Sequence, residues 1–491
     1  MRYYVSSERG NDENVGSIDA PFKSILKLAD LMEAGDTGYL DGEFHEQIKL
    51  GGINGIPGGR NALQQTYIQG WPDANRPLII GEQCLYAGDP DCKYITVKSI
   101  GIQPSGIGCV FDMPETSGEY TFVDLHIIPE SRCHHNIAAF SGGKLYFTGL
   151  KATNAYSDNV VAYDKCAGIE IDSSEIDGSR AGSNFATRGT DEIGVAGSFK
   201  ITRTTLDSAA SGNVDITTRC LATIELCRLS EGGTHNVKVS KAGIVVHYNL
   251  MSNFYGGENI YISSDASAAI HSNILKEADY GVRLGRYINI EQQGTGKVYI
   301  IHNTIVYQSS ACVFIDEDTS DQMFADQNGV ERIRLVPRED YNSEDGDGVF
   351  VEGFENELYM DLRSVFIENN RFVLEGARSY ISMEGIESHS EYVGVDGNRY
   401  FGSTLYDAWG GTSFEDWRNT GRDEHSGEGS DPVFSDPLND NFSVSNIADK
   451  FAGIKPSTIN GVEIRALVHP FSLKQTRPHD NTPGAFAFSE N

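Results

Sequence analysis

The sequence of 491 residues is poor in positive charge and has no long apolar run. Lys and Arg number 39 against 70 Asp and Glu, so the formal net charge is −31. A surface of that sign repels phosphate backbones and anionic lipid headgroups, which argues against nucleic acid and membrane partners. No apolar stretch approaches the roughly 18 residues that a membrane-spanning helix needs, so we expect a soluble protein without membrane insertion.

Cysteine and signal-peptide features are also sparse. The eight cysteines show no CxxC metal pattern and mostly lie in strand-like sequence, where a free thiol packs as a small apolar group. Cys84 and Cys92 flank a short turn and are the one pair that suggests a local disulfide. The N-terminal residues 1–5 lack the apolar core of a signal peptide, so secretion would require a removed leader or another route, such as phage lysis.

A repeat of short strand signatures dominates the middle of the chain. Residues 259–264, 281–286 and 312–317 each alternate an apolar residue with a variable one, which is the period of a strand with one buried face. Ile260, Val282 and Val313 are spaced by 22 and 31 residues, which brackets one turn of a β-solenoid plus an insertion. We therefore predict an all-β right-handed parallel β-helix.

Asparagines recur after these strands and indicate where each coil bends. Asn249, Asn273 and Asn303 each follow a strand signature. Asn tolerates the left-handed backbone of a corner, and stacked Asn side chains can hydrogen-bond along a ladder. An ordinary β-sandwich is the alternative fold, but it would need hairpin turns every 8–12 residues, and turn signals here are sparser.

The ends and the insertions define the expected organisation of a single domain, residues 1–491. Residues 21–32 begin with Pro and carry apolar residues at helical spacing, which predicts a short capping helix within an N-terminal cap and first coil, residues 1–48. Residues 316–354 form a long polar loop insertion, and residues 402–491 form a C-terminal closing segment.

The segments 3–48, 413–426, 431–442 and 484–488 carry a family resemblance. They are similar to the ends of extracellular right-handed parallel β-helix proteins, which include polysaccharide lyases, glycoside hydrolases and phage tailspike-type depolymerases. The resemblance implies an extracellular protein, secreted or phage-borne, that acts on a polysaccharide. It does not specify the reaction, because many activities share this scaffold.

Outward-facing strand positions supply the candidate site. Because apolar residues point inward, their neighbours form outward columns, and we align Glu170, Glu225, Tyr261, Arg283 and Phe314 in one such column. Aromatic rings can stack on sugars, arginine can bind carboxylate or sulfate, and carboxylates can transfer protons. A solvated face that carries these residues by chance is the alternative interpretation.

The leading expectation is a glycoside hydrolase that cleaves an anionic polysaccharide with two carboxylates. Glu170 and Glu225 are 55 residues apart, or about two coils, which approaches the separation of roughly 6.5–9.5 Å in inverting enzymes. Asp172 is a third catalytic candidate. Arg286 and Asp316 join Tyr261 and Phe314 as candidate substrate-binding residues.

The runner-up is a polysaccharide lyase that uses Arg283. β-Elimination of a uronic acid polymer needs a cation for the carboxylate and a base for the C5 proton. Residues 281–286 resemble the arginine-bearing strand of alginate-lyase and chondroitinase-type β-helix lyases, which also place a Glu-x-Glu and a Lys on the preceding coil. Here that coil reads Tyr-Ile-Ser-Ser-Asp from Tyr261 and lacks the Lys. A non-catalytic carbohydrate-binding solenoid is the third alternative.

No cofactor is required by these expectations. His247, His271 and His302 show neither HxH nor HExxH spacing, so packing is preferred to a metal site. Residues 345–348, Asp-Gly-Asp-Gly, are compatible with a loop Ca²⁺ but lack the other ligands of an EF-hand. The sugar, the linkage and the oligomeric state stay open.

Overall fold

The computed structural model describes residues 1–72, 74–89, 92–112, 119–129, 133–140, 143–163, 166–189, 197–254, 256–263, 266–285, 298–315, 334–336, 349–350, 358–359, 365–374, 379–382, 393–402, 413–429, 434–436, 441–444, 458–459 and 462–463. These residues form two compact units, Met1–Ile260 and Tyr261–Asn491. No helix among them is long and apolar enough to cross a membrane.

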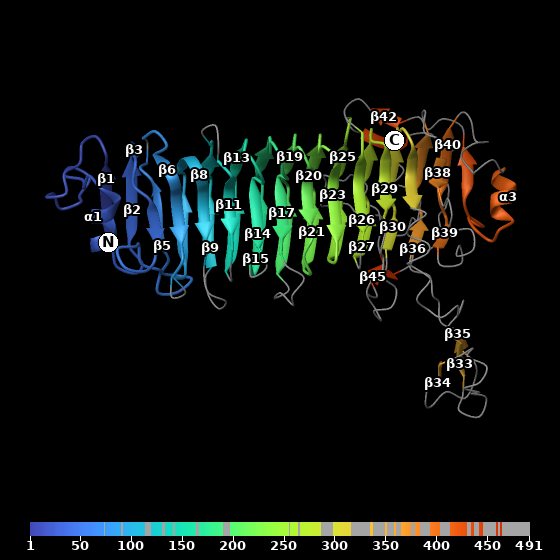
Figure 1. The fold of residues 1–491 in the computed structure, drawn as a ribbon, viewed down its shortest axis with the longest axis horizontal. Helices are drawn as coiled ribbons and strands as arrows, with labels where there is room; N and C mark the ends of the chain where they lie inside the picture. The colour runs from blue at the N-terminus through green and yellow to red at the C-terminus, as the bar shows by residue number, and fades with distance from the viewer. Residues whose placement is uncertain are drawn as a thin grey trace. The chain divides into compact units, whose positions relative to one another are not determined.

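Each unit is built from coils of short parallel strands, and the fold is a right-handed parallel β-helix, as predicted (Figure 1). Strands that follow one another in a coil belong to different ladders, so hydrogen bonds join each strand to its equivalent in the next coil. This arrangement pairs the backbone without hairpins, which excludes the sandwich alternative. We call the ladders first, second and third in the order in which a coil visits them.

In the first unit the first ladder is regular. Its strands are β1 (Arg2–Ser6), β2 (Thr37–Asp41), β5 (Thr66–Gly70), β7 (Ile95–Lys98), β9 (Glu119–Val123), β12 (Lys144–Thr148), β15 (Gly168–Asp172), β18 (Ser198–Thr202), β21 (Leu221–Glu225) and β24 (Gly243–His247).

The second ladder of this unit has shorter strands. They are β3 (Glu43–Phe44), β6 (Leu78–Ala87), β8 (Gly101–Phe111), β10 (His126–Ile127), β13 (Lys151–Thr153), β16 (Glu175–Asp177), β19 (Thr205–Asp207), β22 (Arg228–Ser230) and β25 (Leu250–Ser252). The third ladder contains β4 (Ile48–Leu50), β11 (His135–Ala139), β14 (Val160–Tyr163), β17 (Phe185–Arg188), β20 (Gly212–Ile216), β23 (His235–Ser240) and the start of β26 (Glu258–Ser263). The long strands β6 and β8 continue from the second ladder into the third.

The second unit repeats the pattern. Its first ladder contains β27 (Ser267–His271), β30 (Val298–Ile301), β36 (Val365–Glu368) and β39 (Val393–Asp396). Its second ladder contains β28 (Ile274–Lys276), β31 (Thr304–Val306), β37 (Arg371–Leu374), β40 (Arg399–Gly402) and β41 (Gly427–Gly429). Its third ladder contains β29 (Tyr280–Leu284), β32 (Ala311–Ile315) and β38 (Ser379–Ser382). The remaining elements are α3 (Phe414–Arg418), β33 (Arg334–Val336), β34 (Val349–Phe350), β35 (Leu358–Tyr359), β42 (Phe434–Asp436), β43 (Asn441–Val444), β44 (Thr458–Ile459) and β45 (Val462–Glu463).

Near the N-terminus a short helix, α1 (Ile25–Leu31), lies where the sequence predicts one. Ser24 caps it by accepting a hydrogen bond from the Lys27 amide, and Ile25 and Leu28 are buried. The helix packs closely on the first ladder, because a Cβ at Gly38 would lie 2.7 Å from Leu28 Cδ2. That α1 protects the first coil stays a prediction.

Buried asparagines form ladders of side-chain amides, as the sequence suggests. In the first unit Asn136 donates to Asn159 (2.6 Å), Asn159 to Asn184 (2.8 Å), Asn184 to Asn213 (2.7 Å) and Asn213 to Asn236 (2.7 Å). In the second unit a similar ladder of Asn273, Asn303, Asn370 and Asn398 ends on Asp423.

The predicted left-handed backbone is displaced by one residue. Positive φ angles fall on Tyr248 (58°), Ser272 (57°) and His302 (56°), each just before the expected Asn. The Asn is instead fully or almost fully buried, and the side chains of Asn249 and Asn303 form hydrogen bonds to the backbone of neighbouring coils. Interior hydrogen bonding, rather than tolerance of the left-handed region, explains why Asn recurs here.

The cysteines pack as free buried thiols, as expected, but the suggested disulfide is wrong. All eight cysteines are free and buried, so Cys84 and Cys92 do not form the suggested disulfide. Burial raises the pKa of both thiols to about 12, which keeps them protonated at neutral pH.

Two of the expected segments fall mostly on residues whose structure is not described. The first is the insertion 316–354, which includes the candidate substrate-binding residue Asp316 and the candidate Ca²⁺ loop 345–348. The second is the closing segment 402–491.

Candidate functional site

The predicted carboxylates lie on the first ladder of the first unit, but not in the predicted column. Glu170 is aligned with Lys200, and Lys200 with Thr223, whereas Asp172 is aligned with Thr202, and Thr202 with Glu225. The predicted alignment of Glu170 with Glu225 is therefore wrong by two residues. A two-residue shift keeps every apolar side chain on the buried face, so the alternation alone cannot fix the register.

Asp172 is held in an ion pair that competes with a proton-transfer role. Arg203 donates from Nε to Asp172 Oδ1 (2.8 Å) and from its terminal nitrogen to Oδ2 (2.6 Å), and Thr202 adds a third bond. The hydrogen bonds from Arg203 hold the pKa of Asp172 below its ordinary value, although burial opposes this. Glu225 shares the column and lies 3.9 Å from His247 Nε2.

Tyr261, Arg283 and Phe314 do not belong to the first ladder, which corrects the predicted single stripe. They lie on β26, β29 and β32, which are third strands of their coils, whereas Glu170 and Glu225 lie on first strands. Strands of all three ladders alternate in the same way, so the sequence could not assign them to different faces.

The second unit nevertheless brings these three residues together around the arginine. Arg283 and Phe314 are aligned on neighbouring strands. The guanidinium carbon of Arg283 lies 5.7 Å from the ring centre of Tyr261, 5.6 Å from Phe314 and 5.4 Å from Tyr280. All four side chains are half-buried. We call this group the Arg283 cage.

Local sequence explains how the Arg283 cage is assembled. Tyr280 lies three residues before Arg283 at the start of β29, and its ring is 5.0 Å from that of Phe314. Gly285 leaves room for the tyrosine of β26, because a Cβ there would lie 2.2 Å from Tyr261 Oη. The sequence analysis did not include Tyr280 among the candidate residues. Its position as an aromatic residue at the start of the strand that carries Arg283 could have suggested it.

A guanidinium surrounded by aromatic rings can bind an anion and a sugar ring together. Arginine forms paired hydrogen bonds to carboxylates, and contact with ring faces within about 6 Å orients it. Tyrosine hydroxyls beside it can also carry protons. Arg286, the other predicted arginine of this region, lies outside the described residues.

The third ladder of the first unit carries a second arginine group that the sequence did not reveal. Arg188 donates to Asp215 (2.7 Å) and to Asp158 (3.1 Å), and both carboxylates are almost fully buried. Burial lowers the pKa of Arg188, but the bonds and charges of Asp215 and Asp158 more than offset this and leave it raised. Arg188 thus keeps its charge while its side chain stays 34% exposed.

Stacked aromatic rings lie beside this group. Tyr163 is aligned with Arg188 on the neighbouring strand, and its ring stacks on Phe140 at 4.7 Å with an interplanar angle of 8°. Lys238 is aligned with Asp215 on the other side. Residues 158, 188, 215 and 238 come from four successive coils, so their proximity depends on coil lengths that vary along the chain.

The described residues include no group of three or more His, Cys, Asp and Glu placed to hold a metal ion. Of the three histidines considered for a metal, His247 lies at an outward position beside Glu225, whereas His271 and His302 are buried. The candidate Ca²⁺ segment 345–348 lies outside the described residues.

Comparison with known proteins supports the fold. No protein-family model matches the sequence, and no curated protein matches it. Among solved structures, the protein XylC in complex with xylose is 11% identical, with 100% of this chain and 99% of that chain covered and a TM-score of 0.50.

Two enzymes are similar at lower scores. The GH136 lacto-N-biosidase of Eubacterium ramulus is 15% identical, with a TM-score of 0.37; the match covers 65% of this chain and 64% of the enzyme, which is less than two thirds of its length. Pectate lyase Pel9A is 13% identical, with 100% and 96% covered and a TM-score of 0.42. At an identity of 11%, the likeness to XylC concerns the fold alone.

Proposed function

We propose that the protein is an extracellular enzyme that cleaves an anionic, uronic-acid-containing polysaccharide by β-elimination, with Arg283 as the substrate-binding cation. The observation that carries the proposal is the Arg283 cage, a half-buried guanidinium within 5.7 Å of three aromatic ring centres. The β-helix scaffold, which solved lyases share, is compatible with this chemistry.

The chemistry of β-elimination explains why such a group is useful. Abstraction of the C5 proton of a uronate places negative charge on its carboxylate, and a fixed cation stabilises that charge. The C4–O bond then breaks, a C4–C5 double bond forms, and the leaving oxygen takes up a proton. Tyr261 and Tyr280 are the proton-carrying groups beside Arg283, so we assign them the exchange of these protons.

Because the protein is negatively charged overall, binding of an anionic polysaccharide requires a positively charged side chain at the binding site. With a formal net charge of −31 the protein repels a polyanion at long range, although physiological salt screens this beyond about 8 Å. An arginine that contacts the carboxylate directly can still attract it at short range.

Hydrolysis by Asp172 and Glu225 is the second candidate function, because these residues share a column two strands apart. With roughly 4.8 Å per strand, this is near the upper limit of the inverting separation. The ion pair of Asp172 with Arg203 weighs against it.

Product analysis separates the alternatives. A lyase acting on uronate polymers such as pectate or alginate yields ultraviolet-absorbing unsaturated ends, a hydrolase yields reducing ends without that absorbance, and a binding module yields neither. Arg283→Ala should lower kcat/KM by a factor of about 100 or more, because hydrogen bonds to charged groups contribute roughly 1.5–3 kcal/mol and more in a developing transition state.

Matched variants make this test specific. Arg203→Ala removes an exposed arginine of the first ladder and should leave turnover unchanged, as should Glu225→Gln. Tyr261→Phe and Tyr280→Phe keep the rings but remove the hydroxyls. A variant that has lost a proton-transferring hydroxyl should show a lower kcat with little change in substrate binding. Normal turnover in Arg283→Ala, or loss of turnover only in Glu225→Gln, would overturn the assignment.

A further inference from the structure

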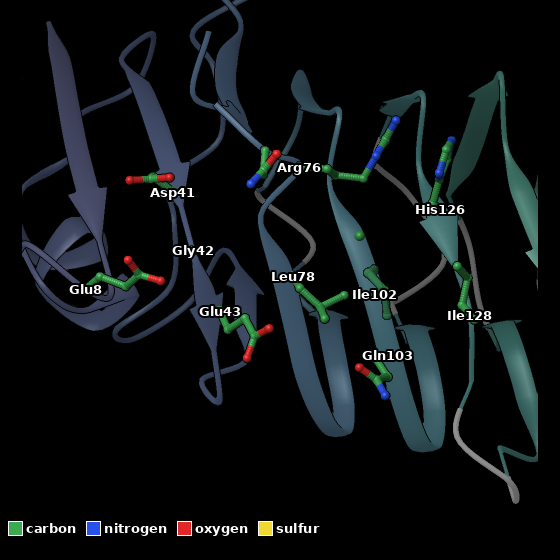
Figure 2. A pocket seen from close by; sticks show the side chains of 12 residues that line it. Glu8, Asp41, Gly42, Glu43, Arg76, Leu78, Ile102, Gln103, His126 and Ile128 are labelled. Carbon is green, nitrogen blue, oxygen red and sulfur yellow. The ribbon is translucent and has the colours of Figure 1, made fainter. Parts of the chain in front are cut away.

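A hollow of about 530 Å³ opens on the second ladder near the N-terminus, apart from the arginine groups. Its volume lies within the range of about 300–1,000 Å³ typical of small-molecule sites. Figure 2 shows the carboxylates of Glu8 and Glu43 on one side, Arg76 and His126 on the other, and the apolar side chains of Leu78, Ile102 and Ile128 near the centre and right.

One outward column of the second ladder runs along the hollow. Glu43 is aligned with Leu78, Leu78 with Gly101, and Gly101 with His126. Gly101 has no side chain, and its neighbours lie close to it, because a Cβ there would be 3.1 Å from Leu78 Cδ1 and 3.6 Å from Arg76 Cδ. Ile128, which is 62% exposed, extends the apolar surface beside Leu78.

The cationic side of the hollow is already neutralised. Arg76 donates to both carboxylate oxygens of Asp124 at 2.9 Å, and His126 lies 3.2 Å from the same carboxylate. Burial and the neighbouring Arg76 lower the pKa of His126, so it is neutral at pH 7. Asp41 is similarly neutralised by Arg9 at 2.9 Å.

The two carboxylates of the opposite side are not neutralised. Within the described part of the chain, the carboxylates of Glu8 and Glu43 form no hydrogen bond and no ion pair. The hollow therefore combines an apolar surface, two carboxylates that need donors, and amide groups from Asn75 and Gln103. An anionic sugar would be repelled there, whereas an ammonium group with a carbon ring would satisfy both the charge and the apolar surface.

We propose that this hollow is a binding site for an amino sugar with a free ammonium group, which Glu8 and Glu43 bind while Leu78 and Ile128 contact the sugar ring. This site differs from the Arg283 cage in the charge of the ligand that it would bind, which is positive here and negative at the cage. The proposal does not depend on the reaction proposed above.

Ligand titrations of the full chain, by calorimetry or ligand-observed NMR, test the proposal. We expect glucosamine to bind at least tenfold more tightly than glucose or N-acetylglucosamine, which lack the ammonium group. The double variant Glu8→Gln/Glu43→Gln should weaken glucosamine binding by about tenfold, since each partly exposed ion pair accounts for roughly two- to fivefold. Glu43→Lys, which places an ammonium in the hollow, should abolish binding.

The matched control is Glu175→Gln, which removes an outward carboxylate of the same ladder that is paired with Lys151 at 2.9 Å outside the hollow. It should bind glucosamine like the unmodified protein. Melting curves establish that each variant is folded. Equal binding of glucosamine and glucose, unchanged binding in the double variant, or no binding of glucosamine at millimolar concentration would each refute the proposal.

Discussion

His235 is a basic side chain that the fold keeps uncharged. It is 4% exposed, and its ring lies against Gly212, where a Cβ would be 2.2 Å from Nε2. Burial lowers its pKa to about 4, and the charge of Asp215 opposes this only in part, while Lys238 and Arg188 reinforce it. Protonation of this residue therefore favours unfolding.

This leads to a pH-dependent stability. Because the unfolded side chain titrates near 6.5 and the folded one near 4, the unfolded state binds the extra proton between these values. The free energy of unfolding should fall as pH is lowered from about 6.5 to 4, by an amount on the order of 3 kcal/mol from this group. Denaturant titrations of the native protein and of His235→Gln at pH 7.5 and pH 5 measure it.

The variant should lose less stability between the two pH values than the native protein. His134→Gln is the control, because it removes an exposed histidine of the same unit. An identical slope in all three proteins would show that His235 titrates normally.

At the scale of elements, the asparagine ladder joins successive coils of the first unit. Asn184 illustrates the connection, because it accepts from Asn159, donates to Asn213 (2.7 Å) and donates to the Asp207 carbonyl (2.7 Å). Its side chain has no exposure to solvent. Removing it leaves buried partners on both sides unsatisfied.

We therefore expect Asn184→Ala to lower the free energy of unfolding by roughly 3–5 kcal/mol, since each unsatisfied buried group costs about 1–3 kcal/mol. Asn136→Ala, near the end of the described ladder, should cost less, because the Asn159 side-chain carbonyl keeps a hydrogen bond from the Ala155 amide and only the Thr153 carbonyl loses its side-chain donor. Urea unfolding monitored by circular dichroism compares the two. Equal costs would mean that the ladder does not act cooperatively.

At the scale of the whole molecule, the ends of a solenoid need protection. The first strand, β1, pairs on one side with β2 and on the other with the backbone of Gly16 and Phe22. Helix α1 contacts β1, and its Leu28 covers Gly38 of β2. An uncovered end would expose backbone donors and acceptors to other chains.

Deleting residues 1–34 removes both β1 and α1 and should cause aggregation of the purified protein, which light scattering measures. The point variant Leu28→Asp should destabilise the same end without shortening the chain. A soluble, monodisperse truncation with an unchanged melting temperature would contradict a capping role.

The sequence by itself determined the fold, because a period of two repeated at coil-length spacing has few solutions other than stacked parallel strands. It also indicated that Tyr261, Arg283 and Phe314 face the same way, since they follow equivalent apolar positions. The choice of ladder and the register of Glu170 against Glu225 required the tertiary structure, because shifts by two residues and exchanges between ladders preserve the alternation. The grouping of Arg188 with Asp158 and Asp215 and the hollow at Gly101 likewise depend on which coils lie next to one another, which variable loop lengths conceal in the sequence.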